Sequence, residues 1–107
     1  MADAILLYVT SPDHETGAAL AEKLISDRMA ACVNLLPGMT SVYDWQGKVE
    51  QATEVVMIVK TTTEKAAPAR DMILTEHPYE CPCIVALPIS GAHSHQPFLD
   101  WIGQNTS

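Results

Sequence analysis

Two cysteines separated by a single residue are the side chains best suited to chemistry in this sequence. Cys81 and Cys83 flank Pro82, and His77 lies four residues before the first of them. In an extended backbone the two thiols would point to the same side, with their Cα atoms about 6.5–7 Å apart. Two thiolates at that spacing suit a soft ion such as Cu(I) or Zn(II), with His77 as a third ligand. The competing interpretation is that both cysteines are small buried side chains, because free cysteine is among the most buried residue types.

A second set of residues is suited to binding a polar ligand between subunits. It consists of Trp45, Glu50, Lys60, Tyr79 and Glu80. Lys60 ends an apolar strand and Glu80 follows a proline turn, so both side chains could line a cleft. The alternative is an ion pair between Lys60 and a carboxylate across a subunit interface, with Tyr79 donating a hydrogen bond there. Trp45 suits an interface anchor, because large aromatic side chains carry much of the energy of association.

The remaining candidate residues favour simpler interpretations. His93 and His95 would share a side in an extended segment, but loop histidines beside glycine and proline usually face solvent. Cys32 lies in an apolar strand and is expected to be core. A Cys81–His77 pair could activate a thiolate, yet the sequence offers no orienting third group and no oxyanion site. We therefore expect a protein that is not an enzyme.

Composition limits the class of protein. The 107 residues suit one domain spanning 1–107, and 48% of them are apolar, so no disulfide or cofactor is required for folding. The net charge is −7 and the basic residues are scattered, which argues against nucleic-acid partners. No segment approaches the roughly 20 apolar residues of a membrane span. The N-terminus lacks the pattern of a signal peptide, and the chain has three cysteines. We therefore expect reduced thiols and a cytoplasmic location.

The pattern of apolar residues predicts four strands and three helices. Strands are expected at residues 4–10 and 84–87, and helices at residues 11–28, 63–77 and 96–102. Ser11 is expected to cap the first helix, Pro68 to make the second start irregular or late, and Gly103 to end the third. Residues 31–61 predict one very long β-hairpin, with a turn at Gly47 and a bulge at Pro37-Gly38.

The order of these elements, β-α-β-β-α-β with a short final helix, predicts an α+β fold. Right-handed connections and a central hairpin give a ferredoxin-like sandwich, with two helices on one face of an antiparallel sheet. Three strands are apolar at consecutive positions, so both faces of the sheet require burial. Two helices cover only one face, and we expect further copies of the chain to cover the other.

Several short segments, in this order and spacing, also resemble a known family. They are Ala31-Cys32-Val33-Asn34, Pro37-Gly38, Thr40-Ser41-Val42-Tyr43 with Trp45, Gly47-Lys48 and Glu50, Lys60-Thr61, His77-Pro78-Tyr79-Glu80, Ala86-Leu87-Pro88-Ile89 and Leu99-Asp100-Trp101-Ile102. Over nearly the whole chain the sequence resembles the CutA family of divalent-cation tolerance proteins.

The resemblance implies a homotrimer of ferredoxin-like subunits whose long hairpins help to join neighbours. It also implies a link to copper and other divalent metals, through binding or tolerance, while the family's biochemical activity is not firmly defined. The same trimeric architecture resembles PII signalling proteins, which bind small anionic or nucleotide ligands in clefts between subunits. The run Cys81-Pro82-Cys83 departs from the family pattern, which has no cysteines there. Thiolate ligands would make this segment prefer softer metal ions than the family pattern implies.

Overall fold

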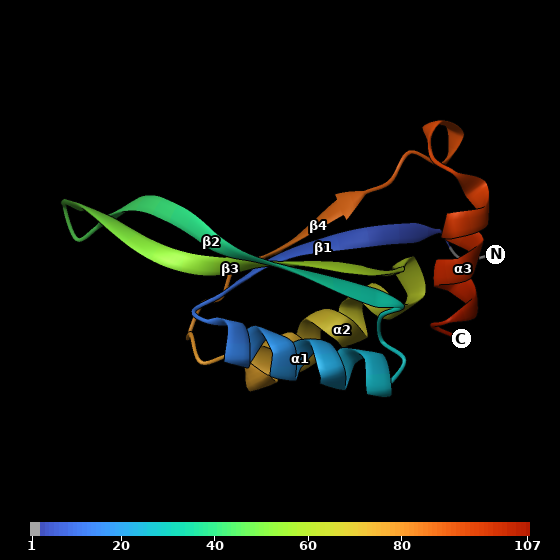
Figure 1. Ribbon diagram of the computed structural model, residues 1–107, viewed down its shortest axis with the longest axis horizontal. Helices are drawn as coiled ribbons and strands as arrows, with labels where there is room; N and C mark the ends of the chain where they lie inside the picture. Colours follow the sequence, from blue (N-terminus) through green and yellow to red (C-terminus); the bar gives the residue numbers. More distant parts are fainter. Residues whose placement is uncertain (1–2) are drawn as a thin grey trace.

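The computed structural model describes residues 3–107 and contains one antiparallel sheet with two long helices on one of its faces (Figure 1). In chain order the elements are β1 (Ala4–Ser11), α1 (His14–Ser26), β2 (Cys32–Trp45), β3 (Lys48–Thr62), α2 (Thr63–Glu76), β4 (Ile84–Pro88), the 3₁₀ turn η1 (Gly91–His93) and α3 (Gln96–Gln104). The strand order is β2-β3-β1-β4. The predicted α+β, ferredoxin-like arrangement of one subunit is thereby confirmed.

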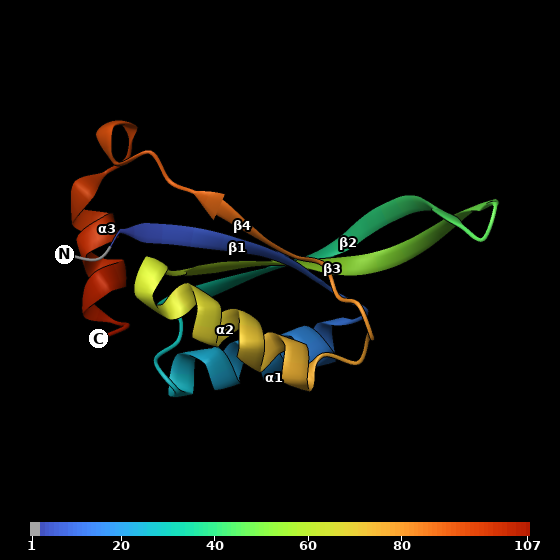
Figure 2. The same ribbon diagram turned by 180° about the vertical axis from the view of Figure 1, so that it is seen from behind.

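The β2–β3 hairpin extends far beyond the rest of the sheet (Figures 1 and 2). Its strands pair from Cys32 opposite Lys60 to Trp45 opposite Lys48. At the tip Gln46 and Gly47 have φ of 51° and 83°, the left-handed pair that a two-residue hairpin turn requires. The register shifts between Leu36 and Met39, where Gly38 has a φ of 78°. The predicted turn and the predicted Pro37-Gly38 bulge are both present.

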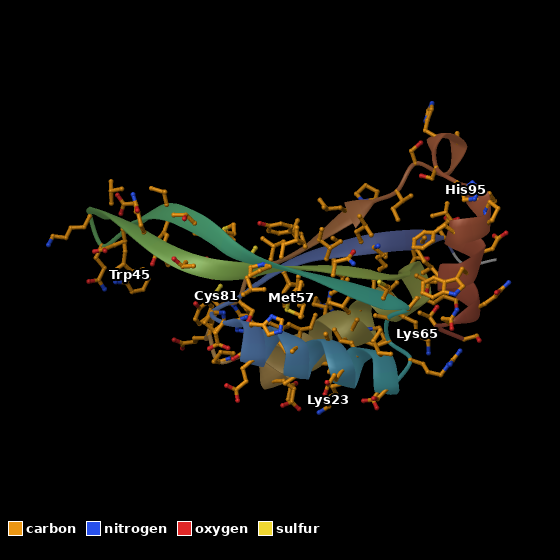
Figure 3. The ribbon with its side chains drawn as sticks, viewed as in Figure 1. Lys23, Trp45, Met57, Lys65, Cys81 and His95 are labelled. Carbon is orange, nitrogen blue, oxygen red and sulfur yellow. The ribbon has the colours of Figure 1, made fainter. Side chains whose placement is uncertain are left out.

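The main core lies between the sheet and the two long helices, where Met57 is fully buried (Figure 3). The buried members of this core are Leu7, Val9, Leu20, Leu24, Ala30, Met57, Val59, Ala69 and Ile73. Alternate strand residues face the helices, so their chain neighbours face the opposite, open side of the sheet.

The open face of the sheet is largely apolar. By register it carries Leu6, Tyr8, Cys32, Asn34, Leu36, Val56, Ile58, Lys60, Val85 and Leu87. Neither α1 nor α2 lies on this side, and Leu36, Val85 and Leu87 are each more than 40% exposed. Cys32 is half-buried here and lies outside the main core, which corrects its assignment as a core residue.

Both long helices begin differently from the prediction. Asp13 caps α1 by accepting from the backbone N–H of Thr16 at 2.7 Å, whereas Ser11 donates its hydroxyl to the carbonyl of Asp13. The Ser11 cap was wrong, because a carboxylate closer to the first turn takes that position. Helix α2 begins at Thr63 and runs through Pro68, so the expected irregular or late start was wrong as well. Pro68 lies on the exposed side of α2 and removes one backbone hydrogen bond without ending the helix.

The end of α1 and the extent of the final helix also differ from the prediction. Helix α1 ends at Ser26, two residues before the predicted end, and Arg28 has a φ of 58°. Helix α3 continues to Gln104, so Gly103 lies inside it and does not end it. Helix α3 lies at the end of the sheet opposite the hairpin tip (Figures 1 and 2). Among residues 3–107 there is no helix of the length and apolar character that crossing a membrane requires.

Candidate functional site

His77 is a buried structural residue in this subunit. Its Nε2 donates to the carbonyl of Thr10 at 2.8 Å, because a carbonyl can only accept. Its Nδ1 accepts from the backbone N–H of Tyr79 at 3.0 Å. The ring is therefore a neutral tautomer that ties the segment after α2 to the end of β1, and neither nitrogen is free to ligate a metal.

Cys81 and Cys83 are both exposed free thiols on the segment between α2 and β4. Cys83 is tied to β1, since its carbonyl accepts from the N–H of Thr10 at 3.4 Å, while Cys81 lies in the preceding bend. The alternative that both side chains are buried in the core is therefore wrong for the subunit. Within the single chain, both residues are therefore open to solvent.

The three predicted ligands do not assemble into one site within the subunit. No group of three or more His, Cys, Asp or Glu side chains in residues 3–107 has an arrangement that could hold a metal ion. With both nitrogens of His77 engaged, the donor set here is the Cys81–Cys83 pair. Two thiolates suit Cu(I), whereas Zn(II) sites in proteins use four ligands.

Glu54 and Tyr79 belong to polar contacts that the sequence did not reveal. Glu54 is 9% exposed and accepts a 2.6 Å hydrogen bond from the hydroxyl of Ser41, which lies diagonally across the hairpin. The ring of Tyr79 packs on His77 at 4.9 Å between centroids. Partial burial and the nearby Glu54 carboxylate raise the pKa of the Tyr79 phenol. A lone glutamate in an apolar strand gives no such signal, because its partners come from other segments.

The residues of the predicted cleft lie apart in one subunit. Trp45 and Glu50 are exposed on the projecting hairpin, and Glu50 precedes Lys60 on β3 by ten residues, or about 33 Å of strand. Tyr79 and Glu80 are exposed near the base of the hairpin, where Tyr79 faces Glu54. One chain therefore cannot bring this set together, and a cleft built from it requires residues of more than one subunit.

Lys60 instead lies in an apolar pocket at the other end of the molecule. We call this cavity of about 520 Å³ the Lys60 pocket, and it is lined by Leu6, Lys60, Ile89, Ser94, His95, Phe98, Leu99 and Ile102. The Lys60 ammonium lies over the ring of Phe98, 5.2 Å from its centroid. Figure 3 places His95 at the opposite end of the molecule from Trp45.

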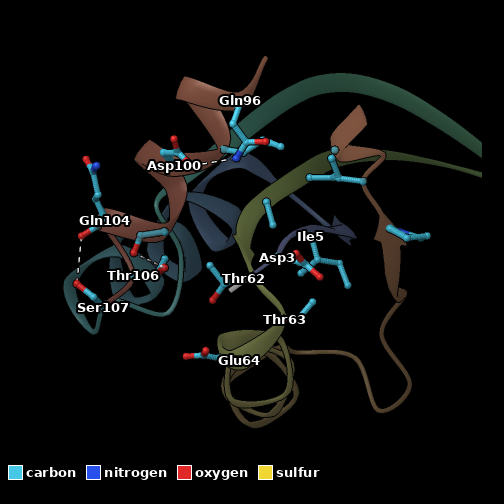
Figure 4. A pocket seen from close by; sticks show the side chains of 16 residues that line it. Asp3, Ile5, Thr62, Thr63, Glu64, Gln96, Asp100, Gln104, Thr106 and Ser107 are labelled. Atoms are coloured by element: carbon cyan, nitrogen blue, oxygen red, sulfur yellow. Dashed lines mark hydrogen bonds between the residues drawn. The ribbon is translucent and has the colours of Figure 1, made fainter. Parts of the chain in front are cut away.

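A larger cavity of about 870 Å³ lies beside α3 and the start of α2 (Figure 4). Its lining includes three carboxylate side chains, those of Asp3, Glu64 and Asp100. Asp100 accepts a hydrogen bond from Gln96 at 2.9 Å. Nothing in the sequence pattern had indicated this acidic cavity, because its residues come from both ends of the chain and from the middle.

Comparison with known families decides the relationship of this chain. The model of the CutA1 divalent ion tolerance protein family matches residues 5–105. The chain belongs to the CutA1 family. The family resemblance recognised in the sequence is confirmed.

Individual CutA relatives support this membership. The divalent-cation tolerance protein CutA of Thermus thermophilus is 42% identical over 94% of this chain and 96% of its own length. The chloroplastic protein CutA of Arabidopsis thaliana is 38% identical, and the match covers 96% of this chain and 56% of that protein.

Solved CutA structures share the fold of the subunit. The divalent ion tolerance protein CutA1 from Ehrlichia chaffeensis has a TM-score of 0.94 at 30% identity, covering 100% of this chain and 98% of that one. The periplasmic divalent cation tolerance protein CutA from Archaeoglobus fulgidus has a TM-score of 0.91 at 41% identity, covering 97% and 99%. The four-stranded sheet with three helices is thus the CutA1 subunit fold.

Proposed function

We propose that this CutA1-family chain acts in divalent-metal tolerance by binding copper at the Cys81–Cys83 pair. The observation that carries the proposal is that both thiols are exposed on one short segment of a divalent-ion tolerance protein. Soft thiolate donors select Cu(I) among the common metals, and two sulfurs alone suit it better than Zn(II). The role is non-enzymatic, with the metal as cargo, and the cytoplasm is the proposed location because thiols stay reduced there.

The proposed working form is a homotrimer. The apolar open face of the sheet and the projecting hairpin both require a partner, and three copies is the number that the family resemblance of the sequence implies. Leu36, Val85 and Leu87 would be covered by neighbouring subunits, while Trp45 at the hairpin tip would contact one of them. A trimer would also allow Glu50 of one subunit and Lys60 of another to share a cleft.

The experiment is a Cu(I) titration of the reduced protein against a competing chelator. A Cys81→Ser/Cys83→Ser variant should lose tight binding, whereas Cys32→Ser, the matched control, should keep it. His77→Gln should also keep the metal affinity of the parent, because His77 is held by two hydrogen bonds. Equal binding by the parent and the double variant would contradict the proposal.

A second candidate function is that of a sensor whose ligand binds between subunits, as in PII-like proteins. One observation favours it: the Lys60 ammonium lies in an apolar pocket over Phe98. This function needs no metal and does not depend on the cysteines. Titration of the Cys81→Ser/Cys83→Ser variant with small anions would separate the two candidates.

A further inference from the structure

The Lys60 pocket combines apolar walls with one positive charge. Leu6 comes from β1, Lys60 from β3, Ile89 from the segment after β4, and Phe98 and Ile102 from α3. Its volume of about 520 Å³ lies within the range of about 300–1,000 Å³ usual for small-molecule sites. Its walls thus suit the apolar body of a ligand, and its charge suits an anionic group.

The charge of Lys60 is not neutralised within the subunit. The ion pairs in residues 3–107 join Lys23 to Glu76 and Arg70 to Asp71, so Lys60 has no carboxylate partner in the described chain. Its neighbours across the sheet are Leu6 on one side and Cys32 on the other. A half-buried cation among apolar side chains is costly without an anion, and this one stands out in a chain of net charge −7.

The start of α3 adds to the positive potential of the pocket. Ser94 and His95 line the cavity immediately before α3, whose first residue is Gln96. No side chain caps this helix, and the positive end of its dipole therefore lies next to Ser94 and His95 in the pocket wall. The neighbouring acidic cavity shares Ile89 and Leu99 as a wall and repels anions, which directs an anionic group to Lys60.

We propose that the Lys60 pocket binds an amphipathic monocarboxylate, with its carboxylate on the Lys60 ammonium and its apolar body against Phe98, Leu6 and Ile102. This inference rests on the second candidate function and names its ligand class. One lysine and one helix end match a single negative charge. A nucleotide triphosphate would bring several charges to a pocket with one permanent cation in an acidic protein.

The test is calorimetric titration of the full chain, in its native assembly, with octanoate. Octanamide serves as the neutral ligand of the same shape, acetate as the anion without an apolar body, and ATP as the polyanion. Octanoate should bind at least about tenfold more tightly than octanamide, because a charge-assisted hydrogen bond is formed only with the acid. Acetate and ATP should bind weakly or not at all.

Two variants locate the binding. Lys60→Met keeps the length and apolar stem of the side chain but removes the charge, so octanoate and octanamide should bind it equally. Lys65→Met is the matched control on α2, on the helical side of the sheet, and should bind octanoate like the parent. Sedimentation must show that both variants keep the assembly of the parent.

Each other outcome overturns the inference. Equal affinity of the parent for octanoate and octanamide would show that the Lys60 charge does not contribute to binding the carboxylate. No binding of octanoate would show that a carboxylate of a second copy, or nothing, occupies the pocket. Binding of ATP that depends on Lys60 would replace the ligand class and still support a sensor. The Cu(I) titration of the same samples reports separately on the metal function, since the cysteines lie outside this pocket.

Discussion

At the scale of single residues, His77 shows how a possible metal ligand becomes part of the framework. The sequence places it four residues from a cysteine pair, which is compatible with a shared ion. In the structure its two nitrogens hold β1 and the segment after α2 together, and its ring contacts Tyr79. Hydrogen-bond partners from distant segments cannot be predicted from the spacing of residues, and they decide the role of this histidine.

Replacement of His77 tests this structural role. His77→Phe keeps an aromatic ring but leaves the carbonyl of Thr10 and the N–H of Tyr79 without partners, so the free energy of unfolding should fall by about 2–4 kcal/mol. Denaturant unfolding of the variant measures the loss. His14→Phe, at an exposed position in α1, is the control and should change stability by less than about 0.5 kcal/mol. An equally small effect for His77→Phe would contradict the assignment.

The exposure of the two cysteines was the other result that the sequence could not supply. Both interpretations, metal ligands and core residues, were compatible with Cys81-Pro82-Cys83. A residue before an apolar strand is buried only if another element covers it, and in the subunit no element covers these two side chains. Thiol exposure therefore depends on tertiary packing, which local sequence does not encode.

At the scale of elements, helix ends control part of the pH dependence of stability. The backbone N–H and hydroxyl of Thr16 hold the pKa of Asp13 below its ordinary value of 3.8. A carboxylate with a depressed pKa stabilises the fold above the ordinary value and loses that contribution as the pH falls through the lower, folded value. The contribution of this cap should therefore be complete at neutral pH and decrease progressively as the pH falls below about 4.

Two variants isolate this contribution. Asp13→Ala should lower the Tm at pH 7, because the N–H of Thr16 loses its acceptor. Asp13→Asn keeps an acceptor and should retain most of the cap with a smaller change in Tm between pH 5 and pH 3. Thermal unfolding across this pH range measures the Tm of both variants. If the Tm of Asp13→Asn fell with acid as much as that of the parent, the acid dependence would come from other carboxylates.

Two glycines should respond to alanine in opposite directions. Gly38 has a φ of 78° in the bulge of β2, where a Cβ has free space but an unfavourable backbone, so Gly38→Ala should destabilise by about 1–2 kcal/mol. Gly103 lies inside α3, where an added methyl group would have no atom within 4 Å, so Gly103→Ala should stabilise the protein by about 0.5–1 kcal/mol. Denaturant unfolding of both measures the difference, and changes of the same sign would contradict these backbone assignments.

Element order and the hairpin were predictable, because apolar runs, Gly47 and Pro37-Gly38 are local signals of strands, a turn and a bulge. The residue that caps α1 and the place of Gly103 inside α3 could not be predicted in this way. Ser11 and Asp13 are both good capping residues, and only the path of the chain out of β1 decides between them. Gly103 remains helical because the hydrogen bonds of α3 continue to Asn105.

At the scale of the whole molecule, the sheet has one covered and one open face. The consecutive apolar residues of β1, β3 and β4 predicted that both faces need burial, and the structure shows which side chains remain uncovered. The projecting hairpin adds more exposed apolar surface, including Trp45 and Val49. A single subunit in water would carry this exposed area at a large cost in free energy, so the assembly is part of the proposed fold.

A charge on the open face should break the assembly. Leu87 is 43% exposed in the single chain and lies beside Leu6 on this face, so Leu87→Glu should convert the proposed trimer into smaller species. Leu74 is 47% exposed on α2, and Leu74→Glu is the matched control that should leave the assembly intact. Sedimentation equilibrium measures both. A monomeric parent, or dissociation by Leu74→Glu alone, would contradict the proposed interface.

The most direct test of the central claim combines assembly and metal in one measurement. Native mass spectrometry of the reduced protein, supplied with one equivalent of Cu(I) per subunit, should show a trimer that carries one copper per subunit. The Cys81→Ser/Cys83→Ser variant should form the same trimer without copper, and Cys32→Ser should match the parent. A parent trimer free of copper, or equal loading of the double variant, would contradict copper binding at this pair.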